Sequence, residues 1–157
     1  VEPGFIEDEM VPIISKSGRL KIEETFFIGV CPIREKEMFK GLEYIGIDFS
    51  SANIEYCKDH SEFNFLVGDF IKMNVNKKYD LVFSHAVIDH VYDIDAFLLN
   101  LVKSCKKYVY INAYRGYFPD LEKHEMKWRD DDNCYYNKIS IKQIQNIFLN
   151  MMRKLLK

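Results

Sequence analysis

Short apolar runs alternate along the chain with stretches in which apolar positions recur at helical spacing. The strongest run is Leu81-Val82-Phe83, which follows Tyr79 and Asp80 and contains no polar residue. Strands that are covered on both faces have this composition, and such strands belong to parallel sheets. Further runs rich in β-branched and aromatic residues predict four more strands, at 25–29, 44–48, 63–67 and 108–111.

The segments between these runs predict helices. Ser50 or Ser51 is suited to cap a helix through Cys57, and Asp93 is suited to cap a helix over 94–104. Helical spacing predicts three more helices, over 5–15, from Pro32 to Phe39, and after Ser140. Strands that alternate with helices are typical of α/β folds. We therefore predict a Rossmann-like three-layer sandwich, a mostly parallel sheet of about five strands with helices on both faces.

The segment 113–138 departs from this alternation. It is polar and aromatic, and it contains Trp128 and the acidic run Asp130-Asp131-Asp132. Loops of this length in a compact domain usually cover a functional site or are mobile. We predict a long loop here.

The overall composition is that of a single globular domain over 1–157. The chain is 48% hydrophobic and 29% charged, which suits one apolar core with a charged surface. The net charge of −2 argues against nucleic acid as a partner, because phosphate binding requires a basic excess or stripe. No apolar run reaches the length of a membrane span, and residues 1–4 lack signal-peptide features. We expect a cytoplasmic protein with no membrane partner.

The sequence favours neither a disulfide framework nor a metal site. The four cysteines lie far apart and form no C-x-x-C pair, so we expect reduced thiols. Two histidines and two aspartates cluster after the strongest apolar run, but their spacing matches no established set of metal ligands. These residues are His85, Asp89, His90 and Asp93.

Three predicted strands end in residues of distinctive chemistry. Gly29 closes the first, Asp48 closes the second and Asp69 follows the third. In parallel α/β sheets, ligands bind beyond the carboxyl ends of the strands. With the motifs at 44–50, 67–70, 79–91 and 107–118, this order resembles the cofactor site of class I S-adenosylmethionine-dependent methyltransferases, of the small methyltransferase-domain type. The resemblance covers residues 25–118.

The resemblance implies S-adenosylmethionine as the cofactor and gives each strand end a role. The loop that contains Gly29 and Cys31 would let the backbone approach the cofactor. Asp48 would accept hydrogen bonds from both ribose hydroxyls, and Asp69 would accept one from the adenine amino group. Carboxylates suit both positions because they only accept hydrogen bonds.

The same resemblance extends to the residues that follow these acids. Phe49 and Phe70 would flank the adenine. Three residues at the end of the strongest strand would lie beside the methionine part and the transferring methyl, namely Ser84, His85 and Ala86.

The acceptor of the methyl group is predicted to be a small molecule. His85 would act as a general base, because an imidazole titrates near neutral pH. His90 would shape the substrate entrance. Tyr114, Arg115 and Tyr117 follow the fifth strand, where an acceptor could be held.

Each of these residues has an alternative structural role. Asp48 could cap the next helix, and Asp69 could be a turn acid. His85 could be a hydrogen-bonded part of the pocket wall. Trp128 and the pair Tyr135-Tyr136 suit packing in the core or in a lid better than base stacking, because the acidic run lies beside them.

Two departures from the family pattern bear on function. The first loop has Phe27 where the family has an acid, and Cys31 and Ile33 where it has glycines. The family also adds two strands after its fifth helix, whereas this sequence stops in the last predicted helix, which leaves a naturally short domain and a C-terminally truncated one as alternatives. The edge of the fifth strand would then be covered by that helix, a second copy, a partner chain or a further segment.

Three hypotheses remain open at this point. The first is a methyltransferase that uses S-adenosylmethionine and acts on an unidentified acceptor. The second is a non-catalytic methyltransferase-like domain that serves as a binding or partner subunit. The third is a nicotinamide dinucleotide enzyme, which is disfavoured because its G-x-G-x-x-G fingerprint would need glycines at Cys31 and Arg34.

Overall fold

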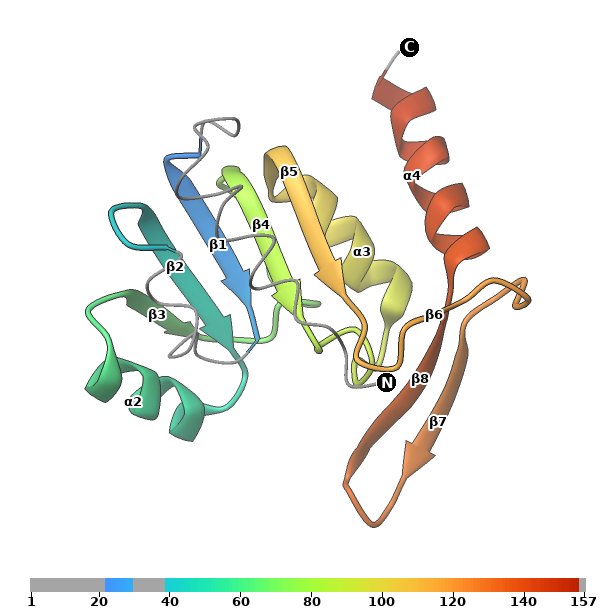
Figure 1. Ribbon diagram of the computed structural model, residues 1–157, viewed down its shortest axis with the longest axis horizontal. Helices are drawn as coiled ribbons and strands as arrows, with labels where there is room; N and C mark the ends of the chain where they lie inside the picture. The colour runs from blue at the N-terminus through green and yellow to red at the C-terminus, as the bar shows by residue number, and fades with distance from the viewer. Residues whose placement is uncertain (1–21, 30–38, 156–157) are drawn as a thin grey trace.

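Five parallel strands form the central sheet in the order β3-β2-β1-β4-β5 (Figure 1). A computed structural model of the chain describes residues 22–29 and 39–155. The predicted helix over 5–15, the predicted helical residues 32–38 and Cys31 lie outside the described residues. The strands of the sheet are β1 Glu24–Ile28, β2 Glu43–Asp48, β3 Asn64–Val67, β4 Tyr79–His85 and β5 Cys105–Asn112.

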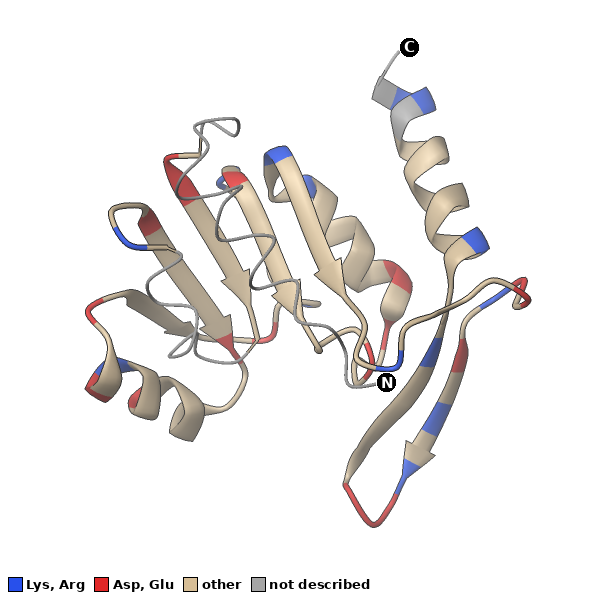
Figure 2. Ribbon diagram, in the orientation of Figure 1, with Lys and Arg blue, Asp and Glu red and all other residues tan. Residues whose placement is uncertain are grey.

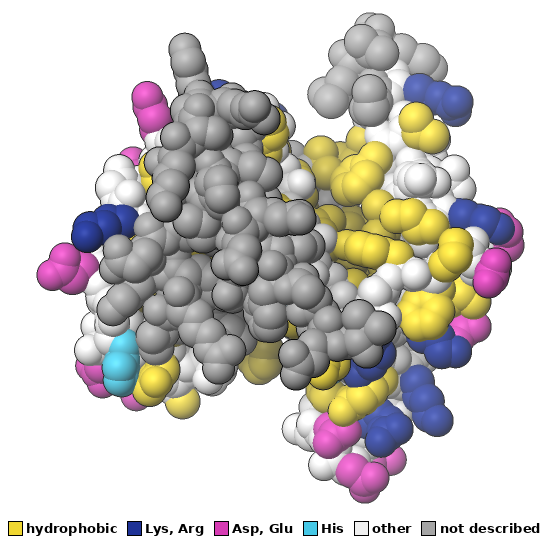
Figure 3. Space-filling model, in the orientation of Figure 1, with side chains coloured by type: hydrophobic (Ala, Val, Ile, Leu, Met, Phe, Trp, Pro, Cys, Tyr) yellow, Lys and Arg dark blue, Asp and Glu magenta, His cyan; other side chains and the backbone are white. Residues whose placement is uncertain are grey.

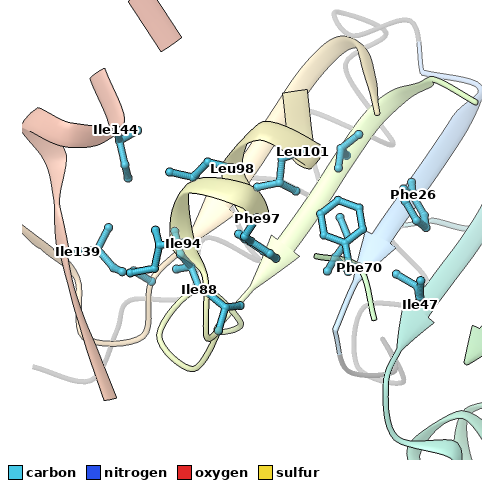
Figure 4. Close-up of a cluster of buried hydrophobic side chains, with 14 of the residues drawn as sticks. Phe26, Ile47, Phe70, Ile88, Ile94, Phe97, Leu98, Leu101, Ile139 and Ile144 are labelled. Carbon is cyan, nitrogen blue, oxygen red and sulfur yellow. The ribbon is translucent and has the colours of Figure 1, made fainter. Parts of the chain in front are cut away.

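The sheet separates two apolar clusters because successive side chains of a strand point to opposite faces. On β1, Phe26 packs in one cluster and Phe27 in the other. The first cluster includes Phe97 and Leu101 of helix α3 (Ile94–Lys103), and Figure 4 shows these side chains between α3 and the strands. The second cluster includes Ile54 of helix α2 (Ser51–His60). Helices therefore cover both faces, and the predicted α/β sandwich is confirmed.

The predicted helix caps are present. Ser50 Oγ accepts from Asn53 N at 3.3 Å, and Asp93 Oδ1 accepts from Ala96 N at 2.9 Å. Each cap satisfies an N–H at the start of a helix that has no partner within the helix. The caps fix where α2 and α3 begin, directly after the loops that follow β2 and β4.

The segment 113–138 is not a long loop, and that prediction was wrong. It contains β6 (Tyr117–Phe118), β7 (Glu125–Arg129) and most of β8 (Cys134–Ser140). β7 and β8 form an antiparallel hairpin, and β6 pairs with β8 in parallel. The hairpin projects beyond the carboxyl ends of the central strands (Figure 1). β7 alternates charged residues with Met126 and Trp128, but the strand has only five residues and all of them are exposed, so the alternation marks no buried face.

The last helix, α4 (Ile141–Leu155), begins after β8, and Ser140 Oγ caps it by accepting from Gln143 N at 3.1 Å. Ile144 packs in the same cluster as α3, as does Ile139 of β8 (Figure 4). The hairpin and α4 are thus joined to the sheet through α3. Within residues 22–29 and 39–155, no helix is both long and apolar enough to cross a bilayer.

His124 holds the start of α4. Its Nδ1 accepts from the backbone N–H of Ser140 at 2.9 Å, and its own backbone N–H donates to Gln143 Oε1 at 2.7 Å. The side chain is only 4% exposed. Burial lowers the pKa of the His124 imidazole, and the charge of Asp95 opposes that effect. If Nδ1 were protonated, its N–H would face the backbone N–H of Ser140 with no acceptor between them, so the structure requires the neutral ring.

Acidification should therefore destabilise the fold through His124. The pKa of the folded state lies below the ordinary value of 6.5, so the unfolded chain takes up this proton first and stability falls as the pH drops below that value. His124→Gln keeps an acceptor at this position and removes the titration. We expect urea unfolding at a series of pH values to show that the free energy of unfolding falls less on acidification for this variant than for the wild type. His60→Gln, at the exposed end of α2, is the control, and parallel losses in wild type and His124→Gln would contradict the assignment.

Candidate functional site

A cavity of about 570 Å³ lies at the carboxyl ends of the central strands, within the range of small-molecule sites. The loops after β1, β2, β3 and β4 contribute to it, and residues of the β7–β8 hairpin line it as well. Figure 2 shows acidic positions at the carboxyl end of β2 and at the hairpin tip, with basic positions along the hairpin strands. The lining residues are Ile28, Gly29, Ile47, Asp48, Phe49, Asn53, Gly68, Asp69, Phe70, Ile71, Ala86, Val87, His90, Val91, Tyr92, Phe97, Trp128, Asn133, Cys134 and Tyr135.

Gly29 occupies a position that requires glycine. Its φ is +92°, and its N–H donates to Ile47 O at 2.9 Å. A Cβ at this position would lie 2.2 Å from Cγ2 of Val87, which belongs to the loop after β4. The loops after β1 and β4 therefore touch at the cavity wall. A close approach of the backbone to a ligand would also require glycine at such a position.

Asp48 ends β2 and is 8% exposed, and it lines the cavity. Its Oδ1 accepts from the backbone N–H of Ser50 at 2.8 Å. The alternative role of Asp48, a structural one at the start of the next helix, is thus partly present, because this contact shapes the turn into α2. A carboxylate offers about four lone pairs, so acceptor capacity remains for a ligand. The neighbouring Phe49 is 82% exposed and presents its ring at the rim of the cavity.

Asp69 also lines the cavity and already has two hydrogen-bond partners, besides Lys72, whose Nζ lies 3.9 Å from Oδ2. Its Oδ1 accepts from Ile71 N at 3.0 Å, and its Oδ2 accepts from the hydroxyl of Tyr92 at 2.6 Å. Burial and the Asp69 charge raise the pKa of Tyr92 to about 12, so the phenol stays protonated and donates. Tyr92 is a cavity residue that the sequence did not single out.

Four other residues predicted near the cofactor lie at different depths. Phe70 lines the cavity wall, but it is 5% exposed and its ring packs edge-on against Phe26 and Phe97. Ser84 is fully buried within β4, and His85 is half-buried at its end; the described lining includes neither. Ala86 does line the cavity, with an unusual φ of +56°. Such a φ costs an L-residue roughly 1 kcal/mol, and the bond from Ala86 N to Asn112 O (3.0 Å) holds it.

Of the four residues predicted to bind the acceptor, the described lining includes His90 alone. Tyr114 is 63% exposed. Arg115 places its guanidinium 3.9 Å from the ring centre of Tyr136. The Tyr117 hydroxyl donates to Ile111 O at 2.7 Å, and burial raises its pKa to about 12, so it fastens β6 to β5.

The hairpin adds aromatic residues that were predicted only to pack. Trp128 and Tyr135 are opposite each other across β7 and β8, and their rings meet edge to face at 5.1 Å. Both line the cavity, as does Cys134. The sequence offers one hint of this wall, the density of aromatic residues next to the acidic run. Among the described residues, no group of three metal-ligating side chains is close enough to hold an ion.

The contact at Gly29 can be tested by stability. We expect Gly29→Ala to destabilise the fold by about 1–3 kcal/mol more than Gly41→Ala, because overpacking forces neighbouring groups apart. Gly41 is the matched control: its φ is +82°, but among the described residues beyond its chain neighbours no heavy atom lies within 4 Å of where a Cβ would stand. Urea unfolding of both variants measures the difference. Equal losses would show that the approach to Val87 does not constrain this loop.

The chain matches the model of the methyltransferase-domain family over residues 30–154. Over 72 residues it is 35% identical to the ubiquinone biosynthesis O-methyltransferase of Pelagibacter ubique, an alignment that covers 43% of this chain and 30% of that protein. The corresponding protein of Rickettsia conorii is also 35% identical over 72 residues and is covered to 25%. The chain thus spans less than a third of the length of these relatives.

Solved structures share the fold. An O-methyltransferase from a trans-AT PKS multienzyme of Brevibacillus brevis, in complex with S-adenosyl-L-homocysteine, superposes with a TM-score of 0.60 at 11% identity, covering 90% of this chain and 49% of that one. An S-adenosylmethionine-dependent methyltransferase from Clostridium acetobutylicum gives 0.62 at 12% identity, covering 90% and 76%. The fold is that of class I methyltransferases, and the chain belongs to the methyltransferase-domain family.

Proposed function

We propose that this domain binds S-adenosylmethionine and transfers its methyl group to a small-molecule acceptor. The observation that carries the proposal is the meeting of Gly29, Asp48 and Asp69 on one cavity. These three residues come from three successive strand ends of a parallel sheet, where ligands of such folds bind. The family match and the names of the relatives support the same activity.

The residues present fit this cofactor. The carboxylates of Asp48 and Asp69 keep acceptor capacity for the ribose and adenine donors. Gly29 lines the cavity with backbone alone, and Phe49 offers a flat exposed surface at the rim.

The cofactor supplies the reactive methyl, so the protein mainly contributes alignment and exclusion of water. The apolar side chains of Ile28, Ile47 and Val91 form part of the wall, and residues of the hairpin contribute to it. Holding the two reactants in line removes the entropy cost of bringing them together, which can lower the activation free energy by roughly 7–11 kcal/mol at best.

A second candidate is a non-catalytic copy that binds a partner. The altered first loop favours it, because Cys31 and Ile33 stand where the family has glycines and Phe27 stands where it has an acid. In the structure Phe27 is 3% exposed and packs against Phe39 and Phe83 in the core. A residue in that place cannot orient the amino group of a cofactor by charge.

Calorimetric titration with S-adenosylhomocysteine separates the two candidates. We expect micromolar binding that Asp48→Ala weakens at least about tenfold, equivalent to about 1.4 kcal/mol, because the ribose hydroxyls lose their acceptor. Asp59→Ala, on the exposed side of α2, should bind like the wild type. Absence of heat at millimolar ligand would refute the methyltransferase proposal and favour the non-catalytic one.

We also place the protein in the cytoplasm. The described cysteines Cys57, Cys105 and Cys134 are free thiols, which suits a reducing compartment. Burial raises the pKa of Cys57 and of Cys105, so both are held as unreactive thiols.

We propose that a second copy of the chain covers the outer edge of β5. Among the described strands, β5 pairs with β4 alone, and Tyr108 on it is 38% exposed. Figure 3 shows hydrophobic side chains gathered between α4 and the body of the sheet, on the same side. An unpaired strand edge beside apolar surface favours pairing with another chain.

Light scattering after size-exclusion chromatography tests this proposal. We expect twice the chain mass of 18.7 kDa for the wild type, and a shift toward the monomer for Tyr108→Lys, since a lysine on an edge strand opposes pairing. Tyr56→Lys, on the exposed face of α2, is the control. A wild-type monomer at micromolar concentration would contradict the proposal.

A further inference from the structure

We infer that Tyr92 is a positioning residue of the cofactor site, and that its hydroxyl holds the Asp69 carboxylate in the orientation that selects a purine with an amino group. The inference rests on the proposed function, because Asp69 is the acceptor proposed there for the adenine amino group. Both residues line the cavity. Tyr92 comes from the loop after β4, so a second loop takes part in recognition of the base at the end of β3.

The bond between the two side chains is short and has one possible direction. The hydroxyl oxygen of Tyr92 lies 2.6 Å from Asp69 Oδ2, within the range of charge-assisted bonds from a hydroxyl to a carboxylate. Burial and the Asp69 charge raise the pKa of Tyr92 to about 12, so the hydroxyl keeps its hydrogen at neutral pH. A carboxylate only accepts, so Tyr92 is the donor.

The turn that carries Tyr92 is fixed on both sides. The carbonyl of Val91 accepts from Asn137 Nδ2 at 2.8 Å, and Asp93 caps α3. The Tyr92 ring itself is 44% exposed, so packing in the core does not determine where its hydroxyl points. The bond to Asp69 gives the hydroxyl its orientation.

The loop after β3 is held by contacts from outside it. Residues 68–78 form neither helix nor strand. Asn100 of α3 is buried, and its Nδ2 donates to the carbonyls of the two residues after Asp69, at 2.8 and 3.1 Å. These bonds fix the backbone of the loop, whereas Tyr92 reaches the carboxylate. The backbone and the acidic side chain thus have separate anchors.

Two donors fix the plane of the Asp69 carboxylate. The torsion that turns this group is broad in aspartate, so a single contact leaves it free to rotate. Here Ile71 N donates to Oδ1 at 3.0 Å and Tyr92 donates to Oδ2, which leaves about one lone pair on each oxygen. Since lone pairs only accept, the site favours a base that presents an N–H at this point. A fixed acceptor also loses less freedom when the ligand binds.

Lys72 does not replace Tyr92 in this role. Its Nζ lies 3.9 Å from Asp69 Oδ2, beyond hydrogen-bond distance, and its side chain is 77% exposed. Exposed ion pairs of this kind contribute little and do not hold a carboxylate in one orientation.

Calorimetry with two ligands tests the inference. The probes are S-adenosylhomocysteine and its 6-deamino analogue, in which hydrogen replaces the adenine amino group. We expect the wild type to bind S-adenosylhomocysteine at least about tenfold more tightly, because the amino group donates to a charged acceptor. Tyr92→Phe should weaken this binding about fivefold and leave that of the analogue unchanged, because only the amino group uses the oriented carboxylate. Tyr56→Phe removes an exposed hydroxyl on α2 and should change neither affinity.

The outcomes separate positioning from a structural role. Equal weakening of both ligands by Tyr92→Phe would show that Tyr92 only supports the shape of the cavity, and would overturn the inference. Unchanged or tighter binding of S-adenosylhomocysteine would overturn it too, since the hydroxyl would then be dispensable or would occupy a lone pair that the ligand needs. A wild type that binds neither ligand would refute the proposed function as well. Binding of S-adenosylhomocysteine by the wild type restricts each of the other failures to the inference.

A double variant tests whether Tyr92 acts through Asp69. In the Asp69→Ala background, Tyr92→Phe should cause no further loss of S-adenosylhomocysteine affinity, because no carboxylate remains to be oriented. A further loss of about fivefold would show that Tyr92 acts on the ligand by itself, against the inference.

The bond can also be measured without any ligand. With tyrosine labelled with ¹³C at Cζ, and Tyr92 assigned by Tyr92→Phe, we expect NMR to show the Tyr92 phenol protonated well above pH 10. Asp69→Ala should lower the pKa of Tyr92 toward its ordinary value of 10. An unchanged pKa in Asp69→Ala would show that the two side chains are not bonded in solution and would overturn the inference. This readout does not depend on cofactor binding, so its failure is distinct from failure of the proposed function.

Discussion

The geometry of the site depends on a pair of buried polar residues, Asp89 and Asn137. The Asp89 carboxylate accepts from the backbone N–H groups of Tyr114 and Arg115, at 2.7 and 3.1 Å, and its backbone carbonyl accepts from Asn137 N at 2.8 Å. Asn137 Nδ2 in turn donates to Ile88 O and Val91 O. Both side chains are fully buried, so loss of these partners would leave unsatisfied groups, at a cost of about 1–3 kcal/mol each or more for the charge. The pair ties the loop after β4, the loop after β5 and β8 into one unit.

This unit explains how residues that are far apart in the sequence meet at one cavity. The apolar clusters on the two faces hold the strands, and Ile139 brings the end of β8 into one of them. The bonds of Asn137 then fix how β8 lies on the loop after β4, because β8 must lie against 88–91 to make them. His90 lies within that stretch, and Tyr135 lies two residues from Asn137. The bond from His90 Nδ1 to Tyr135 O is therefore a consequence of the same docking.

The sequence predicted the parts of the site that depend on chain order. Five strands, three caps and the strand-end residues Gly29, Asp48 and Asp69 follow from local composition and from the rule that parallel strands share one carboxyl edge. The hairpin was missed, although charged residues alternate with Met126 and Trp128 over β7, because that strand is short and exposed throughout and forms no face of the core. Tyr92 escaped notice because its partner, Asp69, lies 23 residues away. Trp128 was assigned to packing because nothing local indicates that it faces a cavity.

The retained glycine carries less functional weight than its place in the motif implies. Packing alone requires Gly29, since Val87 fills the space that a side chain would need. Even an inactive copy of the domain would keep it. Phe27, two residues before Gly29, is a core residue, because its ring stacks on that of Phe83 with 4.9 Å between the ring centres. Phe83 in turn stacks on Tyr110 of β5 at 4.5 Å. The residues of the first loop that the structure describes are thus explained by the packing of the sheet, whereas Asp48 and Asp69 keep lone pairs that face the cavity and that no such packing requirement explains.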